Sequence, residues 1–214
     1  MPTLPSVRDQ AERLISLGVH HCAGLSAEWL RMATSGSSGE AGLLVIHPDL
    51  APASVLVKAL NVNGRPGFVV SDMSDVDEFT PISSIEMPSA PVYLVRDLDR
   101  GDAMANWSPD EALPAIADAD RTPLTLTEGL HWVLQRHEVL ERGHCFMTIG
   151  SRRRKPDGGL DSHTPAVWIS NGTGRDGPAN RNAPKVGWCW AGNRHTWLGF
   201  ASAGGRLTLE QQIA

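Results

Sequence analysis

The sequence predicts one α+β domain in which helices come first and a mainly antiparallel sheet follows, ending in a β-hairpin. Helical patterns with clear start signals crowd the first two-thirds of the 214 residues, whereas apolar runs of strand length fill the last third. Hydrophobic residues make up 41% and charged residues 20%, which is typical of a globular core. We therefore expect a single unit over residues 1–214, not a doubly wound sheet.

Charge and cysteine content narrow the class of protein. The net charge is −5 and the one basic cluster, residues 152–155, is short, so we expect no nucleic-acid partner. No apolar run has the length of a membrane span, and the N-terminus lacks the apolar segment of a signal peptide. These features predict a cytoplasmic protein with no membrane partner. Three widely spaced cysteines predict reduced thiols, not a disulfide framework.

The N-terminal part predicts a helical hairpin over residues 5–35. Apolar residues follow a helical period over residues 7–17, and Ser26 is a suitable N-cap for a second helix over residues 27–34. The Gly- and Ser-rich stretch 35–42 then predicts a flexible connector.

The middle of the chain predicts short alternating elements. Apolar runs of strand length occupy residues 43–47, 67–72 and 91–95. Pro48 breaks the first run, and residues 51–60 predict a short helix between the first two strands.

Two further helices have strong start signals. Ser108 and Glu111 form one capping box, and Thr125 and Glu128 form another, in which the cap side chain and the Glu satisfy each other's backbone N–H groups. The second helix carries an apolar face, made of Leu126, Leu130, Val133 and Leu134.

The last third predicts strands separated by long loops. Strands are expected over residues 145–150 and 166–170, followed by a hairpin over residues 186–201. The stretches 151–165 and 171–185 are rich in Gly, Pro and Asn, which is typical of mobile loops.

The order of several motifs along the chain resembles a known family. The motifs are AGLSAEWL, GRPGFVVSD, PVYLVRDLDRGD, WSPDEALPAI, PLTLTEGL, CFMTIGSR, PAVWIS and VGWCWAGNRHTWLGFASA, the last being the most specific. Together they resemble a mainly actinobacterial family of uncharacterised proteins, a domain of unknown function, over nearly the whole chain. The resemblance implies no reaction, cofactor or catalytic residue. The loop over residues 153–183 is longer than expected for that family, and residues 19–22 are more polar.

Residues 185–203 concentrate aromatic and reactive side chains. Gly192 and Asn193 both tolerate the positive φ of a two-residue turn. A hairpin centred there pairs Trp190 with His195 and places Cys189 opposite Thr196 on the other surface. In that register Cys189 and His195 are too far apart to act as a nucleophile and its base.

The same register predicts one aromatic face, made of Trp188, Trp190, His195 and Trp197. We expect this face either to line a small-molecule pocket or to belong to the protein's own core. In the first hypothesis the protein is a small-molecule-binding protein or an enzyme, with His195 as the catalytic acid–base residue. Arg194 or Arg152 then holds an anionic group of the ligand, because a guanidinium fork suits carboxylate or phosphate. No cofactor is indicated.

Two alternatives remain open. In the second hypothesis the tryptophan face buries against a partner protein, including a second copy in a homodimer, because Trp and Arg dominate interface hot spots. A third hypothesis is a metal-binding protein. His20, His21 and Cys22 offer nitrogen and sulfur ligands, but they need a distant further ligand such as His47, His163 or His195.

Overall fold

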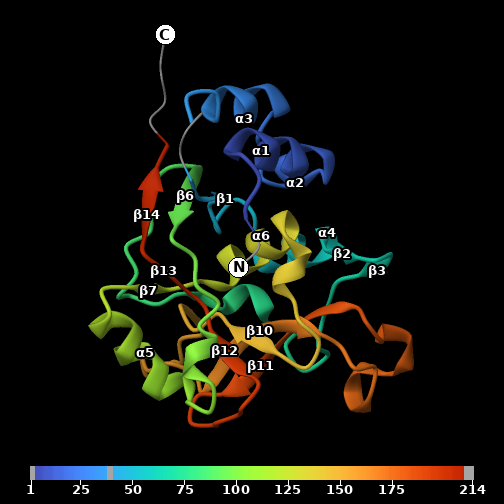
Figure 1. Ribbon diagram of the computed structural model, residues 1–214, viewed down its shortest axis with the longest axis vertical. Helices are drawn as coiled ribbons and strands as arrows, with labels where there is room; N and C mark the ends of the chain where they lie inside the picture. Colours follow the sequence, from blue (N-terminus) through green and yellow to red (C-terminus); the bar gives the residue numbers. More distant parts are fainter. Residues whose placement is uncertain (1–2, 38–40, 210–214) are drawn as a thin grey trace.

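The computed structural model describes residues 3–37 and 41–209 and has the predicted α+β class. Figure 1 shows α1 to α3 at one end of the molecule, a five-stranded sheet with α5 at the other, and α6 between them. The α-helices in this part of the chain are α1 (Val7–Ser16), α2 (Val19–Cys22), α3 (Ala27–Ala33), α4 (Ala53–Ala59), α5 (Pro109–Asp118) and α6 (Leu126–Gln135). Short 3-10 helices are η1 (Val76–Glu78), η2 (Asp102–Met104), η3 (His137–Val139), η4 (Gly174–Asp176) and η5 (Pro178–Asn180).

The strands form two main sheets and three small pairs. The first sheet is antiparallel with the order β1-β6-β14, from Leu43–Ile46, Val92–Arg96 and Gly205–Thr208. The second has the order β12-β8-β10-β11-β4, from Leu198–Phe200, Cys145–Met147, His163–Ile169, Pro184–Trp190 and Phe68–Val69. The pairs are β13-β7 (Ser202–Ala203, Thr122–Pro123), β2-β3 (Asn61–Val62, Arg65–Pro66) and β5-β9 (Thr80–Pro81, Ser151–Arg152).

The predicted N-terminal helices are confirmed as α1 and α3. The hydroxyl of Ser26 accepts a hydrogen bond from the backbone N–H of Trp29 at 3.0 Å, so the predicted N-cap is in place. The short helix α2 lies between them. Residues 38–40 of the predicted connector 35–42 lie outside the described residues.

The helix α6 is buried along its whole length, although its sequence predicts only one apolar face. It packs against β1 of the first sheet and β10 of the second, so both of its sides are covered (Figure 1). Gly129 allows the close approach, because a Cβ there would lie 2.6 Å from the methyl group of Thr148 and 3.2 Å from the ring of Phe146. The polar side chains on α6 therefore depend on hydrogen-bond partners inside the protein.

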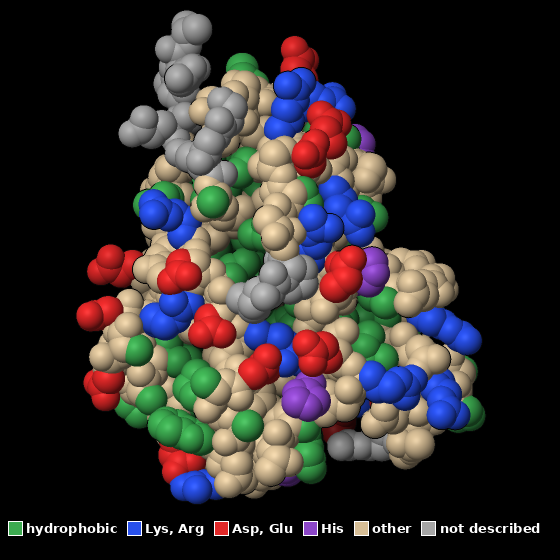
Figure 2. Space-filling model, viewed as in Figure 1, with side chains coloured by type: hydrophobic (Ala, Val, Ile, Leu, Met, Phe, Trp, Pro, Cys, Tyr) green, Lys and Arg blue, Asp and Glu red, His purple; other side chains and the backbone are tan. Residues whose placement is uncertain are grey.

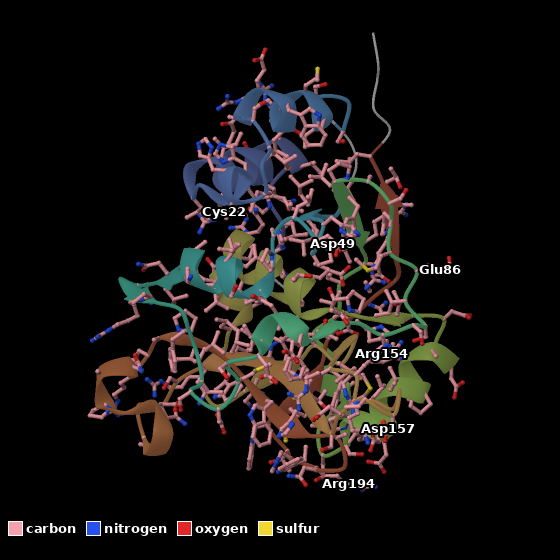
Figure 3. All side chains as sticks on the ribbon, turned by 180° about the vertical axis from the view of Figure 1, so that it is seen from behind. Cys22, Asp49, Glu86, Arg154, Asp157 and Arg194 are labelled. Carbon is pink, nitrogen blue, oxygen red and sulfur yellow. The ribbon has the colours of Figure 1, made fainter. Side chains whose placement is uncertain are left out.

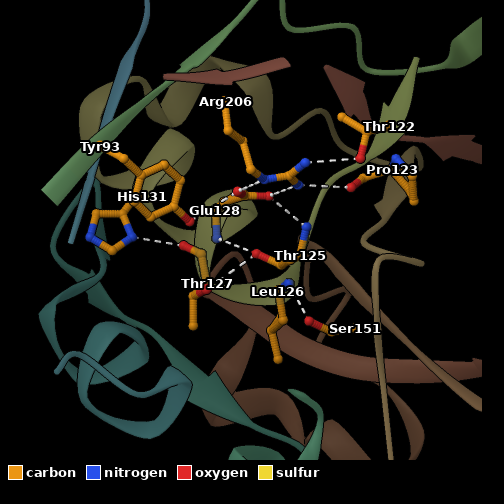
Figure 4. Close-up of polar contacts among 10 residues, drawn as sticks. All are labelled: Tyr93, Thr122, Pro123, Thr125, Leu126, Thr127, Glu128, His131, Ser151 and Arg206. Carbon is orange, nitrogen blue, oxygen red and sulfur yellow. Dashed lines mark hydrogen bonds and ion pairs between the residues drawn. The ribbon is translucent and has the colours of Figure 1, made fainter. Parts of the chain in front are cut away.

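Glu128 meets this requirement with a network of hydrogen bonds (Figure 4). Its carboxylate accepts two hydrogen bonds from Arg206 of β14, at 2.6 and 2.7 Å, and one from the hydroxyl of Tyr93 at 3.0 Å. The same carboxylate accepts the backbone N–H of Thr125 at 2.8 Å, which completes the predicted capping box. The network joins α6 to both β6 and β14.

His131 of α6 instead covers the edge of the first sheet. The backbone N–H of Ile46, on the edge strand β1, donates to Nε2 of His131 at 3.2 Å. The hydrogen must then lie on Nδ1, which donates to the carbonyl of Thr127 at 2.8 Å. Gln10 of α1 does the same for Leu44, whose N–H donates to its side-chain oxygen at 2.8 Å. Side chains from two helices thus take the place of a neighbouring strand.

The predicted hairpin over residues 186–201 is wrong in its pairing. β11 pairs with β10 and β4, whereas β12 pairs with β8, so β8 and β10 lie between the two expected partners. The physical reason is that β10 offers β11 seven consecutive residue pairs. This long pairing outweighs the local preference for a turn at Gly192 and Asn193. The turn forms one residue earlier, with the N–H of Asn193 donating to the carbonyl of Trp190 at 3.0 Å.

The two stretches predicted as long loops contain more regular structure than expected. β9 and the first residues of β10 fall within 151–165, and η4 and η5 fall within 171–185. None of the helices in the described part of the chain has the length and apolar character needed to cross a membrane. On the face shown in Figure 2, side chains of both charges are interspersed, and hydrophobic side chains reach the surface mainly near α5.

Candidate functional site

A cavity of about 490 Å³ lies against the face of the five-stranded sheet that α5 partly covers. Cys145 and Met147 of β8 and Ala166 and Trp168 of β10 line it with side chains from one face of the sheet. The remaining lining comes from Gly143, His144, Ile169, Asn171, Trp188, Cys189, His195, Trp197 and Leu198.

The loop from residue 191 to 197 brings His195 and Trp197 to this cavity. Two backbone hydrogen bonds hold the loop, from Asp110 N–H to the carbonyl of Ala191 and from Asn106 N–H to the carbonyl of His195, both at 3.0 Å. The ring of His195 stacks on that of Trp197, with centroids 4.6 Å apart and planes 19° apart. The site is therefore built where a loop, held by α5 and the segment before it, meets the sheet.

Trp168 is a lining residue that sequence reasoning missed. Its indole lies across β11 at Gly187, where a Cβ would come within 2.6 Å of the ring. The ammonium group of Lys185 lies 4.3 Å from the ring centroid and also contacts both carboxylate oxygens of Asp176, at 2.6 and 2.7 Å. Only the register of β10 against β11 brings Trp168, Gly187 and Lys185 together, and no local signal reveals that register.

Both cysteines at the cavity are poor nucleophiles. Burial raises the pKa of Cys145 to about 12, and the nearby thiol of Cys189 adds to the increase. Burial also raises the pKa of Cys189, although hydrogen bonds from Trp190 and Asn193 oppose it. The predicted burial of Cys145 beside Met147 is confirmed. The prediction that Cys189 and His195 face opposite surfaces is wrong, because both residues line the cavity.

The structure separates the predicted aromatic face into two groups. Trp197 and His195 stack beside the cavity, whereas Trp190 lies opposite His163 across the β10–β11 pair. Trp188 lines the cavity, and its ring meets that of His163 edge-on with centroids 4.0 Å apart.

Neither predicted anion-binding arginine lines the cavity. Arg194 forms an ion pair with Glu111 at the start of α5. Arg152 is buried, and its Nε donates to the backbone carbonyl of Asp161 at 2.9 Å.

The residues proposed as metal ligands do not form a cluster in the described part of the chain. The rings of His20 and His21 have centroids 4.0 Å apart and planes tilted by 38°, and Cys22 is exposed at the end of α2. Cys22 and Arg194, which neighbours His195, lie at opposite ends of the molecule (Figure 3). Within residues 3–37 and 41–209, no three His, Cys, Asp or Glu side chains gather in a way that would hold a metal ion.

Comparison with known proteins places the chain in a family. A model of a family of unknown function, DUF5701, matches residues 13–209. The chain belongs to DUF5701. No curated protein and no solved structure is significantly similar to it. In this DUF5701 chain every lining residue of the cavity falls inside the matched range, whereas the first half of α1 falls outside it.

Proposed function

We propose that this chain binds a small, uncharged molecule with a planar part in the cavity beside His195. The composition of the lining carries the proposal. None of the lining residues in the described part of the chain is Lys, Arg, Asp or Glu, and a flat apolar surface is combined with a few hydrogen-bonding groups. This combination is typical of sites for small organic ligands. The ligand class is therefore neutral, not the anionic class that a guanidinium would hold.

The lining residues have distinct roles in this proposal. Trp168 and Trp197 supply aromatic surface for the planar part of the ligand. His195 and Asn171 supply hydrogen-bonding groups for its polar atoms. His195 is also the acid–base residue if the ligand is a substrate, because a thiol with a raised pKa, such as that of Cys189, is protonated at neutral pH.

A fragment screen followed by NMR tests the proposal. Neutral heteroaromatic fragments are titrated into the ¹⁵N-labelled chain, and the expected result is saturable shifts of the backbone and indole signals of Trp197. His195→Ala and Trp197→Ala should each weaken binding by about tenfold or more. Trp190→Ala is the matched control, because this tryptophan is also exposed but lies outside the lining. Fragments that bind equally well to all three variants would refute the site.

Exposed tryptophans support a second candidate function, binding to another protein chain. Trp107, Trp190 and Trp197 expose 41, 45 and 49% of their surface. Trp190 precedes the loop 191–197 and Trp197 ends it. Trp107 lies beside the same loop, because the N–H of its neighbour Asn106 donates to the carbonyl of His195 at 3.0 Å. A second copy of the chain is the partner to test first, since a self-complementary patch gives a symmetric dimer.

Light scattering after size exclusion separates the two candidates. Homo-assembly predicts a molecular mass that rises with concentration and a return to the monomer in Trp197→Ala. A constant monomer mass for the unaltered chain would remove the dimer and leave the ligand site standing.

A further inference from the structure

A second aromatic cluster lies beside the cavity on β10 and β11, made of His163, Trp188 and Trp190, and only Trp188 of the three lines the cavity. Neighbouring side chains on a strand alternate between faces, so His163 and its partner Trp190 point away from Cys189. The ring centroid of His163 lies 4.0 Å from that of Trp188 and 4.5 Å from that of Trp190. The centroids of the two indoles lie 4.9 Å apart. The three rings therefore form one continuous aromatic surface.

Asp161 fixes the orientation of the imidazole of His163. Its Oδ1 accepts a hydrogen bond from Nδ1 of His163 at 2.6 Å and one from the backbone N–H of His163 at 2.8 Å. Its Oδ2 accepts a hydrogen bond from Arg153 at 2.7 Å. Burial alone raises the pKa of Asp161, but these hydrogen bonds outweigh it and hold the pKa well below its usual range. The carboxylate is therefore ionised, Nδ1 carries a hydrogen, and Nε2 is the nitrogen left for a ligand.

The charged groups nearest this imidazole are paired with one another. Arg153 also forms an ion pair with Asp75, which precedes η1. The buried guanidinium of Arg152 donates to the backbone carbonyl of Asp161 at 2.9 Å. Asp110 also interacts with the charge of Arg152, and Glu78 with that of Arg153. The charged groups nearest the imidazole are thus engaged with one another, which favours a neutral ligand.

The cluster is open to solvent on one side. Trp190 exposes 45% of its surface, and the side chain of His163 exposes 28%. A single exposed indole suits the C–H face of a sugar ring, whereas a flat aromatic ligand gains more from a slot between two rings. When the imidazole is neutral, Nε2 is a hydrogen-bond acceptor that suits a hydroxyl group.

We propose that His163 and Trp190 form a second ligand site that takes a neutral hydroxylated ring, such as a terminal sugar of an oligosaccharide. The apolar face of the ring stacks on Trp190, and one hydroxyl donates to Nε2 of His163. Asp161 is a positioning residue, because it holds the imidazole so that Nε2 faces the ligand. His163 and Trp190, which would contact the ligand, do not line the cavity, although Trp188 contributes to both sites.

Titration of the ¹⁵N-labelled full chain with three trisaccharides tests the proposal. The probes are maltotriose, cellotriose and triacetylchitotriose, and sorbitol serves as a polyol without a ring. The expected result is saturable shifts of the Trp190 indole N–H and the His163 ring with at least one trisaccharide, at roughly millimolar affinity. Sorbitol should produce none. Saturable shifts with sorbitol, or no saturable shift at either residue with any trisaccharide, would overturn the site.

Variants decide whether the named residues carry the binding. Trp190→Ala and His163→Gln should each weaken the trisaccharide by about tenfold, whereas Trp107→Ala, a matched exposed tryptophan, should leave binding unchanged. Asp161→Asn should weaken binding as well, with an altered ¹⁵N tautomer pattern of His163 that a purely structural loss would not produce. Equal losses in Trp107→Ala and Trp190→Ala would refute the assignment. Trp197→Ala separates the two sites, because it removes part of the cavity lining only.

Discussion

The polar groups around Glu128 and those around the cavity differ in how far hydrogen bonds within the protein satisfy them. Around Glu128, each carboxylate oxygen has protein donors, and the donors come from β14, β6 and the residue before α6 (Figure 4). Around the cavity, the side chains of His195 and Asn171 line open space. A fully satisfied polar network holds a fold together, whereas polar groups left facing a cavity are available to a ligand. The difference adds to the composition of the lining as support for a ligand site at the cavity.

Glu128→Gln should have the largest effect, and it tests whether the network around Glu128 stabilises the fold. The substitution leaves the guanidinium of Arg206 buried without its carboxylate, and breaking a buried pair in this way costs about 3–5 kcal/mol. Urea unfolding at neutral pH measures the loss. Glu111→Gln is the matched control, because Glu111 holds the same capping-box position in α5 but its ion pair with Arg194 is exposed. Equal losses at the two positions would show that Glu128 is only a helix cap.

A pH titration of stability tests His131 in the same network of buried polar groups. Burial lowers the pKa of His131 from 6.5 to about 4, so the unfolded chain binds a proton in this range and the folded chain does not. The stabilising contribution of the neutral imidazole is fully present above pH 6.5. As the pH falls toward 4 this contribution is lost, and the free energy of unfolding decreases by about 3 kcal/mol in total. His131→Gln should be less stable at neutral pH but should lose less stability on acidification. An unchanged acid slope in the variant would assign the slope to other groups.

Gly187→Ala tests how the cavity wall is held. The new Cβ would overlap the indole of Trp168, so we expect a loss of about 1–3 kcal/mol and weaker fragment binding at the cavity. Gly192→Ala is the matched control, because the structure shows open space around that position. Thermal unfolding and the NMR fragment titration provide the two readouts. If Gly187→Ala behaves like Gly192→Ala, Trp168 is not held by this contact.

The smallest expected effect concerns the thiols. Cys22 is exposed, whereas Cys145 is buried and the pKa values of Cys145 and Cys189 are raised. Iodoacetamide at neutral pH should therefore modify Cys22 first and the other two slowly, as followed by peptide mass spectrometry. Cys22→Ser should remove the fast reaction and leave the slow ones unchanged. Fast modification of Cys189 would make it a candidate nucleophile and reopen its pairing with His195.

Local signals predicted the helices well. The capping boxes that begin at Ser108 and Thr125 both form as expected, because the cap and the Glu lie three residues apart and need no other part of the chain. The capping-box pattern does not predict the buried partner of Glu128, since Arg206 lies 78 residues away. The sequence therefore located the helix but not its burial.

The candidate site was predicted only in part. Residues 185–203 were singled out because tryptophan and histidine are concentrated there, and Trp188, His195 and Trp197 do line the cavity. The local turn signal placed Cys189 away from His195, whereas β10 takes β11 as its partner and both residues reach the lining. Trp168 was missed because its role depends on Gly187 across the strand pair.

The sequence by itself determined the α+β class, the helix starts and the segment that carries the aromatic residues, because each depends on spacing within a few residues. The tertiary structure alone decided which strands pair, which face of the sheet each side chain joins and which polar groups are satisfied. These outcomes depend on contacts between distant segments, and a shift of one residue in a strand moves every side chain to the opposite face. Cys189 and Trp190 illustrate the result, since these neighbours on β11 point to opposite faces of the sheet and only Cys189 lines the cavity.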